Sequence, residues 1–190
     1  MNVHLTKIYT RTGDAGDTRL SDNSKVHKTD PRLTAYADVD ETNSVLGVVL
    51  ATATFDTGVY EALRAVQNDL FDVGADLSTP VVESPPHPPL RVTQNYVDRL
   101  ESLCDEYNAQ LGKLDSFILP GGTPGGALLH QARCVARRAE RSAWALMEHD
   151  AERTHELPAK YLNRLSDLLF ILARLANPEG DVLWRPAGNA

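Results

Sequence analysis

The sequence predicts an all-α protein, a bundle of five helices that follows a polar N-terminal segment. Apolar residues recur at intervals of three and four in five separate segments, which is the spacing of one face of a helix. Leu and Ala are abundant, aromatic residues make up only 6% of the chain, and no segment shows a convincing strand-like alternation. Because 190 residues suit one good core, we expect a single domain over residues 1–190, with the bundle in residues 31–177.

The N-terminal segment, residues 1–30, is expected to form a loop. Its stretch TRTGDAGDTRLSD, residues 10–22, is too polar for a core strand and too rich in Gly and Asp for a stable helix. The backbone N–H groups and hydroxyls of such a loop could wrap a polyphosphate, although the Walker pattern G-x-x-x-x-G-K-[ST] does not occur. An ordinary surface loop is the alternative.

The first two helices follow this loop. The first is expected to begin near Pro31 and to end near Gly58. In the second, apolar residues recur at three and four from Leu63 to Leu77, and a proline then ends the pattern. The next stretch, VVESPPHPPLR, residues 81–91, is a connection, because prolines inside a helix remove hydrogen bonds.

Three more helices complete the bundle. The third is expected between Thr93, a suitable N-cap residue, and Gly112, which is typical just past a helix end. The fourth is expected over residues 127–148 and the fifth over residues 159–176, where Asn-Pro follows. Residues 178–190 are left as a C-terminal tail.

The fourth helix has two contrasting faces. At about 100° per residue, its apolar side chains cluster within an arc of about 80°, which predicts the core face: Leu128, Ala132, Val135, Ala139 and Leu146. The opposite side carries a charged stripe that is joined by His130 and Trp144: Arg133, Arg137, Glu140 and Arg141. This stripe is either a solvated face or an anion site, because arginine forms bidentate bonds to phosphate oxygens.

Two other helices carry unexpected residues on their outer faces. In the fifth, Phe170 shares the face opposite the core with three polar residues, Asn163, Asp167 and Arg174. Because a solvated face rarely includes a phenylalanine, this side is expected to meet another surface. In the first, Asp40 shares a stripe with apolar residues. It is either a solvated or capping residue or, if buried, a residue that needs a cationic partner. The arginine stripe could supply that partner, within the chain or from a neighbouring subunit.

The connection FILPGGTPGG, residues 117–126, is the other unusual segment. Its glycines would let the backbone approach a flat ligand closely. Phe117 and Ile118 would be exposed if nothing covered them. A well-packed interhelical loop is the alternative.

Composition argues against several classes of protein. A formal net charge of −7 makes non-specific binding to nucleic acid or to an anionic membrane improbable. No apolar run approaches the roughly 18 residues of a membrane span. Two cysteines without metal-type spacing are typical of a reducing compartment, so we expect a cytoplasmic protein.

Five motifs, in order along nearly the whole chain, resemble the PduO-type ATP:cob(I)alamin adenosyltransferases: IYTRTGDAGDTRL, ADVDETNSVLG, FILPGGT, RCVARRAER and YLNRLSDLLFILAR. The resemblance implies a five-helix bundle that assembles as a homotrimer, with active sites between adjacent subunits. It also implies the reaction: cob(I)alamin attacks C5′ of ATP, adenosylcobalamin forms and triphosphate leaves. ATP, Mg²⁺ and cobalamin are the ligands it implies, and the product could pass directly to an adenosylcobalamin-dependent mutase.

The resemblance assigns roles to individual residues. It places in the ATP loop Thr10, Arg11, Thr12, Gly13, Thr18 and Arg19, followed by Lys28. On the helices, the ATP-contacting motif corresponds to Arg137, Arg138, Ala139, Glu140 and Arg141, with Asn163 as the last contact. Asp40 and Arg133 correspond to a salt bridge across the subunit interface, and Phe117 to the aromatic residue under the corrin ring. Catalytic roles fall to Phe117, Arg137, Asp40 and Arg133.

One departure from the family pattern affects the ATP loop. Where the family often has TKTGDKG, this chain has TRTGDAG, so Ala15 replaces a positive charge that the triphosphate could use. Asp17 adds a negative charge that would favour a magnesium ion, but the sequence does not identify the metal ligands.

The implied chemistry needs geometry and charge stabilisation and no general base, because Co(I) carries no proton. The nucleophile and C5′ must be held in line, and cations must stabilise the leaving triphosphate. Phe117 would displace the axial base below cobalt and so ease the reduction to Co(I). The sequence has no Ser-His-Asp or Cys-His constellation, which fits this chemistry.

Two rival interpretations come from other classes. A ferritin-like metal bundle needs two E-x-x-H motifs, and this chain has one, Glu152–His155, before a proline. A non-catalytic module, such as a cobalamin carrier or a nucleotide sensor, would bind the same ligands without releasing triphosphate.

Overall fold

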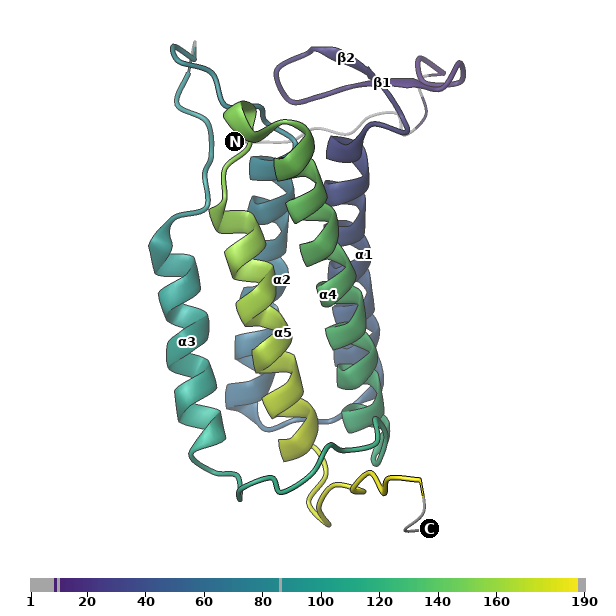
Figure 1. The fold of residues 1–190 in the computed structure, drawn as a ribbon, viewed down its shortest axis with the longest axis vertical. Helices are drawn as coiled ribbons and strands as arrows, with labels where there is room; N and C mark the ends of the chain where they lie inside the picture. The colour runs from purple at the N-terminus through teal and green to yellow at the C-terminus, as the bar shows by residue number, and fades with distance from the viewer. Residues whose placement is uncertain (1–8, 10, 86, 188–190) are drawn as a thin grey trace.

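The computed structural model describes residues 9, 11–85 and 87–187, and in this part of the chain it has five α-helices (Figure 1). Their bounds are α1 Pro31–Thr52, α2 Thr57–Leu77, α3 Gln94–Asn108, α4 Pro124–His149 and α5 Leu157–Leu175, with a short 3₁₀ helix, η1, at Ala151–Arg153. The predicted fold class, an all-α bundle of five helices, is confirmed. No helix in the described ranges has the length and apolar character that crossing a membrane requires.

Helices α1, α2, α5 and α4 form a ring around the core, and α3 lies outside this ring. Helix α1 packs against α2 and α4, while α5 packs against α4 and α2, and α3 packs against α5. Faces α1/α2 and α4/α5 are therefore opposite faces of the ring. The largest side chains that are fully enclosed come from all five helices: Leu46, Leu63, Leu70, Leu77, Leu100, Leu129, Leu146, Tyr161, Leu162, Leu165, Leu168 and Leu169.

Capping residues set the helix ends, and they explain where the predicted bounds were wrong. The first helix ends at Thr52 and not near Gly58, because Ala53 is extended and the Asp56 side chain caps α2 by accepting from Val59 N. Helix α4 begins three residues earlier than predicted, because the Thr123 hydroxyl accepts from Gly126 N. Helix α3 ends at Asn108, four residues before the predicted glycine.

The expectation that the chain has no strands was wrong in one place. Strands β1, Asp17–Arg19, and β2, Lys25–His27, form an antiparallel hairpin in which Thr18 pairs with Val26. Three residues are too few for an alternating pattern to be visible in a sequence. The hairpin lies at the end of the bundle where α1 begins, and the C-terminal segment lies at the opposite end (Figure 1).

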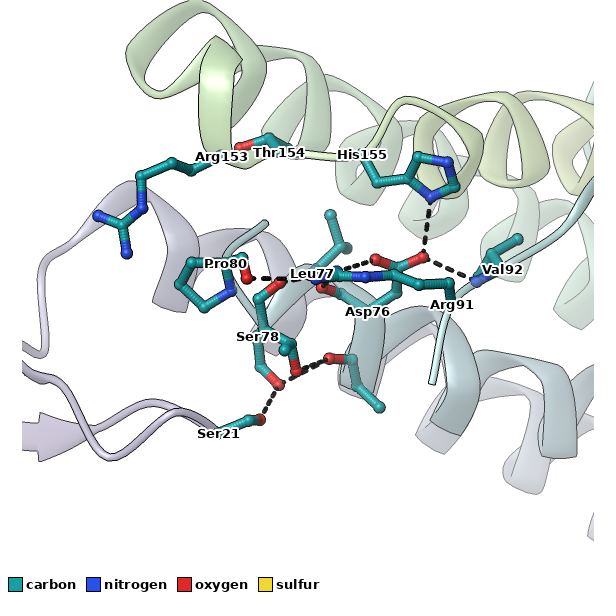
Figure 2. A network of polar contacts seen from close by, with 12 residues as sticks. Ser21, Asp76, Leu77, Ser78, Pro80, Arg91, Val92, Arg153, Thr154 and His155 are labelled. Atoms are coloured by element: carbon teal, nitrogen blue, oxygen red, sulfur yellow. Dashed lines mark hydrogen bonds and ion pairs between the residues drawn. The ribbon is translucent and has the colours of Figure 1, made fainter. Parts of the chain in front are cut away.

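A buried polar network fastens the proline-rich connection to the hairpin end of the bundle (Figure 2). Asp76, only 2% exposed, accepts hydrogen bonds from Arg91 Nη1 at 2.5 Å and from Val92 N at 2.7 Å, and its Oδ2 lies 3.1 Å from His155 Nδ1. Arg91 also donates to the carbonyl of Pro80 at 3.2 Å. The Arg91 guanidinium thus joins the two ends of the connection, and the Asp76 carboxylate holds that guanidinium in place.

The same end of the bundle holds the hairpin turn in place. Leu20 is buried, and Ser21 Oγ lies 2.7 Å from Ser78 Oγ at the end of α2 (Figure 2). Arg32, 3% exposed, donates from Nη1 to the Leu77 carbonyl and from Nη2 to Asp150 Oδ2, both at 2.8 Å. The polar N-terminal loop is therefore carried on a rigid platform made by the ends of α1, α2 and α4.

Candidate active site

The predicted ATP loop is organised around the hairpin. Lys28 N donates to the Gly16 carbonyl at 2.8 Å, which brings the end of β2 back onto the loop. A Cβ at Gly13 would lie 3.1 Å from both Lys28 Nζ and the Asp17 carbonyl oxygen, so this close approach favours glycine. Gly13 and Lys28, which lie far apart in the loop sequence, are thus neighbours. Thr10 lies outside the described residues.

Two hollows flank the hairpin. The first, of about 430 Å³, is lined by four of the predicted loop residues, Thr12, Gly13, Thr18 and Arg19, together with Asp17 and Lys25. The second, of about 440 Å³, lies between the hairpin and α1, and it is lined by Thr18, Lys28, Leu33, Thr34, Ala37 and Asp38. Predicted ATP-loop residues therefore converge on adjoining hollows. Arg11 is exposed and has a left-handed backbone with φ 61°.

Asp17, the residue expected to favour a magnesium ion, is engaged within the loop. Its Oδ2 lies 2.6 Å from Lys25 Nζ, and this hydrogen bond is the main reason that the pKa of Asp17 lies below its usual value. In the described residues no group of three His, Cys, Asp or Glu side chains could hold a metal ion. Glu152 and His155, the single E-x-x-H motif, lie in η1 and just after it.

The predicted ATP-contacting motif on α4 contains two kinds of arginine. Arg138 is paired with Glu41 and lies 3.5 Å from Asp38, both on α1, so its charge is already compensated within the chain. Arg137 is exposed, and within the described ranges its guanidinium has no hydrogen-bond or ion-pair partner. Arg141 is also exposed and donates from Nη1 to the Arg137 carbonyl at 3.1 Å. Arg137 and Arg141 are thus available to an anion.

Glu140 and Asn163 are brought together across α4 and α5. Asn163 Nδ2 donates to Glu140 Oε1 at 3.1 Å, so the two predicted ATP contacts form one polar unit next to the arginines. Ala139, in contrast, is fully enclosed in the core. Its side chain faces away from the stripe and cannot contact a ligand, although the residue lies within the motif in the sequence.

The helical wheel of α4 predicted the wrong exposure at two positions, Leu128 and His130. Leu128 is only partly buried, and Leu129 occupies the core position instead. His130, expected among the exposed arginines, is 2% exposed, and its ring contacts Phe170 of α5 edge-on at 6.0 Å. The wheel places His130 beside Arg133 correctly, but it cannot show that α5 covers this part of the stripe.

An aromatic cavity of about 730 Å³ lies at the end of the bundle opposite the hairpin. Its aromatic, cationic and imidazole side chains come from the α3–α4 connection, α4, α5 and the C-terminal segment: Phe117, His130, Arg133, Phe170 and Trp184. Phe117 is 78% exposed, and its ring meets Trp184 edge-on at 6.1 Å. The Arg133 guanidinium lies 6.0 Å from the Phe170 ring centre. This cavity could receive a flat, largely apolar ligand.

Two members of this cavity are informative. Both ring nitrogens of His130 are buried without a hydrogen-bond partner among the described residues, and burial, followed by the charge of Arg133, lowers the pKa of His130. Trp184 was missed by sequence reasoning, because it lies in a tail without periodic pattern. An exposed tryptophan close to the chain end was the only available signal.

Two glycines of the FILPGGTPGG connection, Gly122 and Gly126, serve packing. A Cβ at Gly122 or Gly126 would lie 2.2 or 2.5 Å from Asn177 Oδ1. That oxygen accepts from Thr123 N at 2.9 Å, so Asn177 ties the start of α4 to the end of α5. Of the two interpretations of this connection, the packed interhelical loop accounts for these glycines, while Phe117 still projects from it.

Asp40 and Arg133 do not meet within one chain. Asp40 is exposed in a hollow of about 590 Å³ on the α1/α2 face, which also includes Asn43 and Phe71. Arg133 lies on the α4/α5 face, on the opposite side of the ring. Arg133 of the same chain is therefore not the partner of Asp40.

The fold and the site define a helical-bundle protein with a polar hairpin loop at one end, an aromatic cavity at the other and an arginine stripe between them. A family model described as cobalamin adenosyltransferase matches residues 8–176. The chain belongs to the cobalamin adenosyltransferase family.

Similar proteins and structures agree with this assignment. The corrinoid adenosyltransferase of Mycobacterium tuberculosis is 66% identical over 189 residues, covering 100% of this chain and 98% of that protein. The corrinoid adenosyltransferase of Bacillus subtilis is 41% identical over 180 residues, covering 93% and 89%. A variant PduO-type ATP:corrinoid adenosyltransferase from Lactobacillus reuteri, complexed with cobalamin and ATP, superimposes with a TM-score of 0.88 at 36% identity, covering 95% of this chain and 100% of that chain.

Proposed function

We propose that this chain transfers the 5′-deoxyadenosyl group of ATP to cob(I)alamin, forming adenosylcobalamin and releasing triphosphate. The observation that carries the proposal is the order of side chains along α4. From Arg133, at the aromatic cavity, to Arg141 the helix advances by about 12 Å at 1.5 Å per residue. A nucleotide laid along this stripe would have its sugar towards the cavity and its phosphates towards the hairpin.

The phosphate end of the proposed site consists of the hairpin and the uncompensated arginines. Charge develops on triphosphate as it leaves, so preorganised cations there stabilise the transition state more than the bound substrate. Arg137 and Arg141 offer such cations, together with Arg19 and Lys28 of the loop. Mg²⁺ would bind chiefly to phosphate oxygens, because Asp17 is already paired with Lys25.

The corrinoid end of the proposed site is the aromatic cavity. Phe117 stands 78% exposed at its wall, so its ring is accessible to a corrin and would displace the lower axial base. The apolar walls would exclude water from the reactive cobalt centre. The corrin supplies the nucleophile, and the protein supplies position and shelter.

The proposed active site is completed by a second copy of the chain. Asp40 and Arg133 lie on opposite faces, so a pair between them can form only between molecules. Such a contact is head-to-tail, and it closes into a ring when the rotation per subunit divides a full turn. A homotrimer is the closed ring that we propose, with the Asp40–Arg133 pair at each of its interfaces.

The test is an anaerobic assay in which chemically reduced cobalamin and Mg-ATP are mixed with the protein. We expect the absorbance of cob(I)alamin to be replaced by that of adenosylcobalamin, with one triphosphate released per turnover. A carrier or sensor module would bind both ligands and release no triphosphate, which would contradict the proposal.

A further inference from the structure

The C-terminal segment of the described chain, residues 178–185, is paired with the connection that carries Phe117. We call this segment the C-terminal strap. Leu119 N donates to the Val182 carbonyl at 2.8 Å, and Trp184 N donates to the Phe117 carbonyl at 2.7 Å. Ser116 Oγ donates to the Trp184 carbonyl at 3.1 Å. The strap thus fixes the backbone of Phe117 from one side.

The strap has little apolar burial to hold it in place. Val182, Leu183 and Trp184 are 62%, 46% and 46% exposed, so burial of these side chains contributes only part of its anchorage. Trp184 contacts Phe117 edge-on, but Phe117 is itself exposed and cannot anchor the strap to the bundle. Another interaction must join the strap to the helices.

That interaction is an ion pair between the strap and the last turn of α5. Arg174 Nε lies 2.8 Å from Asp181 Oδ2, and the two side chains are only 10% and 9% exposed. Arg174 also donates from Nη2 to the Gly112 carbonyl at 3.0 Å, in the connection between α3 and α4. One guanidinium therefore joins the strap, α5 and the start of the connection that leads to Phe117.

We propose that Arg174 and Asp181 are positioning residues for the corrinoid site, acting as a latch that holds the strap and, through it, the ring of Phe117. This inference rests on the proposed function, because it assigns the aromatic cavity to the corrinoid. It also accounts for the polar outer face of α5, where Arg174 has its partner in the strap and Phe170 faces the cavity. Loss of one partner leaves the other charge enclosed and uncompensated, which favours release of the strap.

The latch can be tested without any ligand through the fluorescence of Trp184. The chain has two tryptophans, so Trp144→Phe leaves Trp184 as the single reporter. In this background we expect Asp181→Asn to raise the acrylamide quenching constant of Trp184 about twofold, while Asp181→Glu keeps it close to the parent value. The matched control is Asp167→Asn, which removes the carboxylate from the more exposed ion pair between Arg164 and Asp167 on α5. This variant should leave the quenching constant of Trp184 unchanged. Circular dichroism verifies that each variant keeps its helices.

The same variants are then assayed with cob(I)alamin and ATP. Asp181→Asn should lower kcat about tenfold and leave the KM for ATP unchanged, because the hairpin and the arginine stripe are untouched. Unchanged quenching in Asp181→Asn, or raised quenching with an unchanged kcat, would overturn the latch. Failure of the proposed function would look different: the parent protein would form no adenosylcobalamin, while the quenching comparison would still decide whether the ion pair holds the strap.

Discussion

Replacing Arg137 with alanine should separate ATP binding from folding. Arg137 is exposed on α4, and among the described residues its guanidinium has no polar partner, so the fold does not depend on it. We expect Arg137→Ala to change the free energy of unfolding by no more than about 0.5 kcal/mol, as is usual for surface positions. In the proposed site, however, this arginine meets the triphosphate.

The expected loss of ATP affinity follows from the chemistry of the missing contact. A hydrogen bond to a charged group contributes about 1.5–3 kcal/mol, which corresponds to a roughly 10- to 150-fold weaker Kd for Mg-ATP. Arg138→Ala is the informative neighbour, because Arg138 is already paired with Glu41 and Asp38. Those groups are partly exposed, so its removal should cost about 0.5–1 kcal/mol of folding stability.

The assay is isothermal titration of each variant with Mg-ATP at fixed ionic strength, with urea unfolding alongside. Arg64→Ala on α2 is a control with the same change in net charge, and it should bind ATP as the parent does. Normal ATP affinity and normal turnover in Arg137→Ala would refute the assignment of the arginine stripe to the nucleotide.

Three further predictions concern other parts of the molecule. Asp40→Ala should weaken self-association, measured by sedimentation velocity, without changing the stability of one chain, whereas a monomeric wild type at micromolar concentration would contradict the shared site. Because burial lowers the pKa of His130, the unfolded chain gains a proton below about pH 6.5 that the folded chain resists, so stability falls as pH drops through this range. His130→Phe should remove this contribution, so the free energy of unfolding in urea should differ less between pH 7.5 and pH 5.5 in the variant than in the parent. Asp76→Ala strands Arg91 and should lower stability by about 3 kcal/mol, and a loss below 1 kcal/mol would mean that the network in Figure 2 matters little.

Sequence reasoning predicted the helices well, because their signal is repeated many times. Five segments with apolar spacing of three and four became α1 to α5, and the errors in their bounds lay at helix ends. Asp56 is such a case, since one side chain accepting from Val59 N starts α2 where the pattern alone continued α1. A local hydrogen bond outweighs periodicity at a helix end.

The parts that were missed depend on contacts between distant segments. The strap carries no repeating pattern, so its pairing with Phe117 and the Arg174–Asp181 contact could not be read from the tail. His130 was placed on the correct face of α4, but its burial depends on Phe170, forty residues further along the chain. Helical periodicity gives the direction of a side chain and cannot identify the element that covers it.

In the proposed site, α4 sets the distance between the two substrates. The aromatic cavity is fixed to α4 by His130 and Arg133, and the phosphate end by Arg137 and Arg141, so one rigid helix links the nucleophile to the leaving group. In-line displacement needs the reacting atoms within about 3–3.5 Å, and a continuous helix holds such a spacing better than two loops would. Admission of a corrinoid and closure around it then fall to Phe117 and the strap. The structure attaches these segments to the bundle through a few polar contacts and little apolar burial.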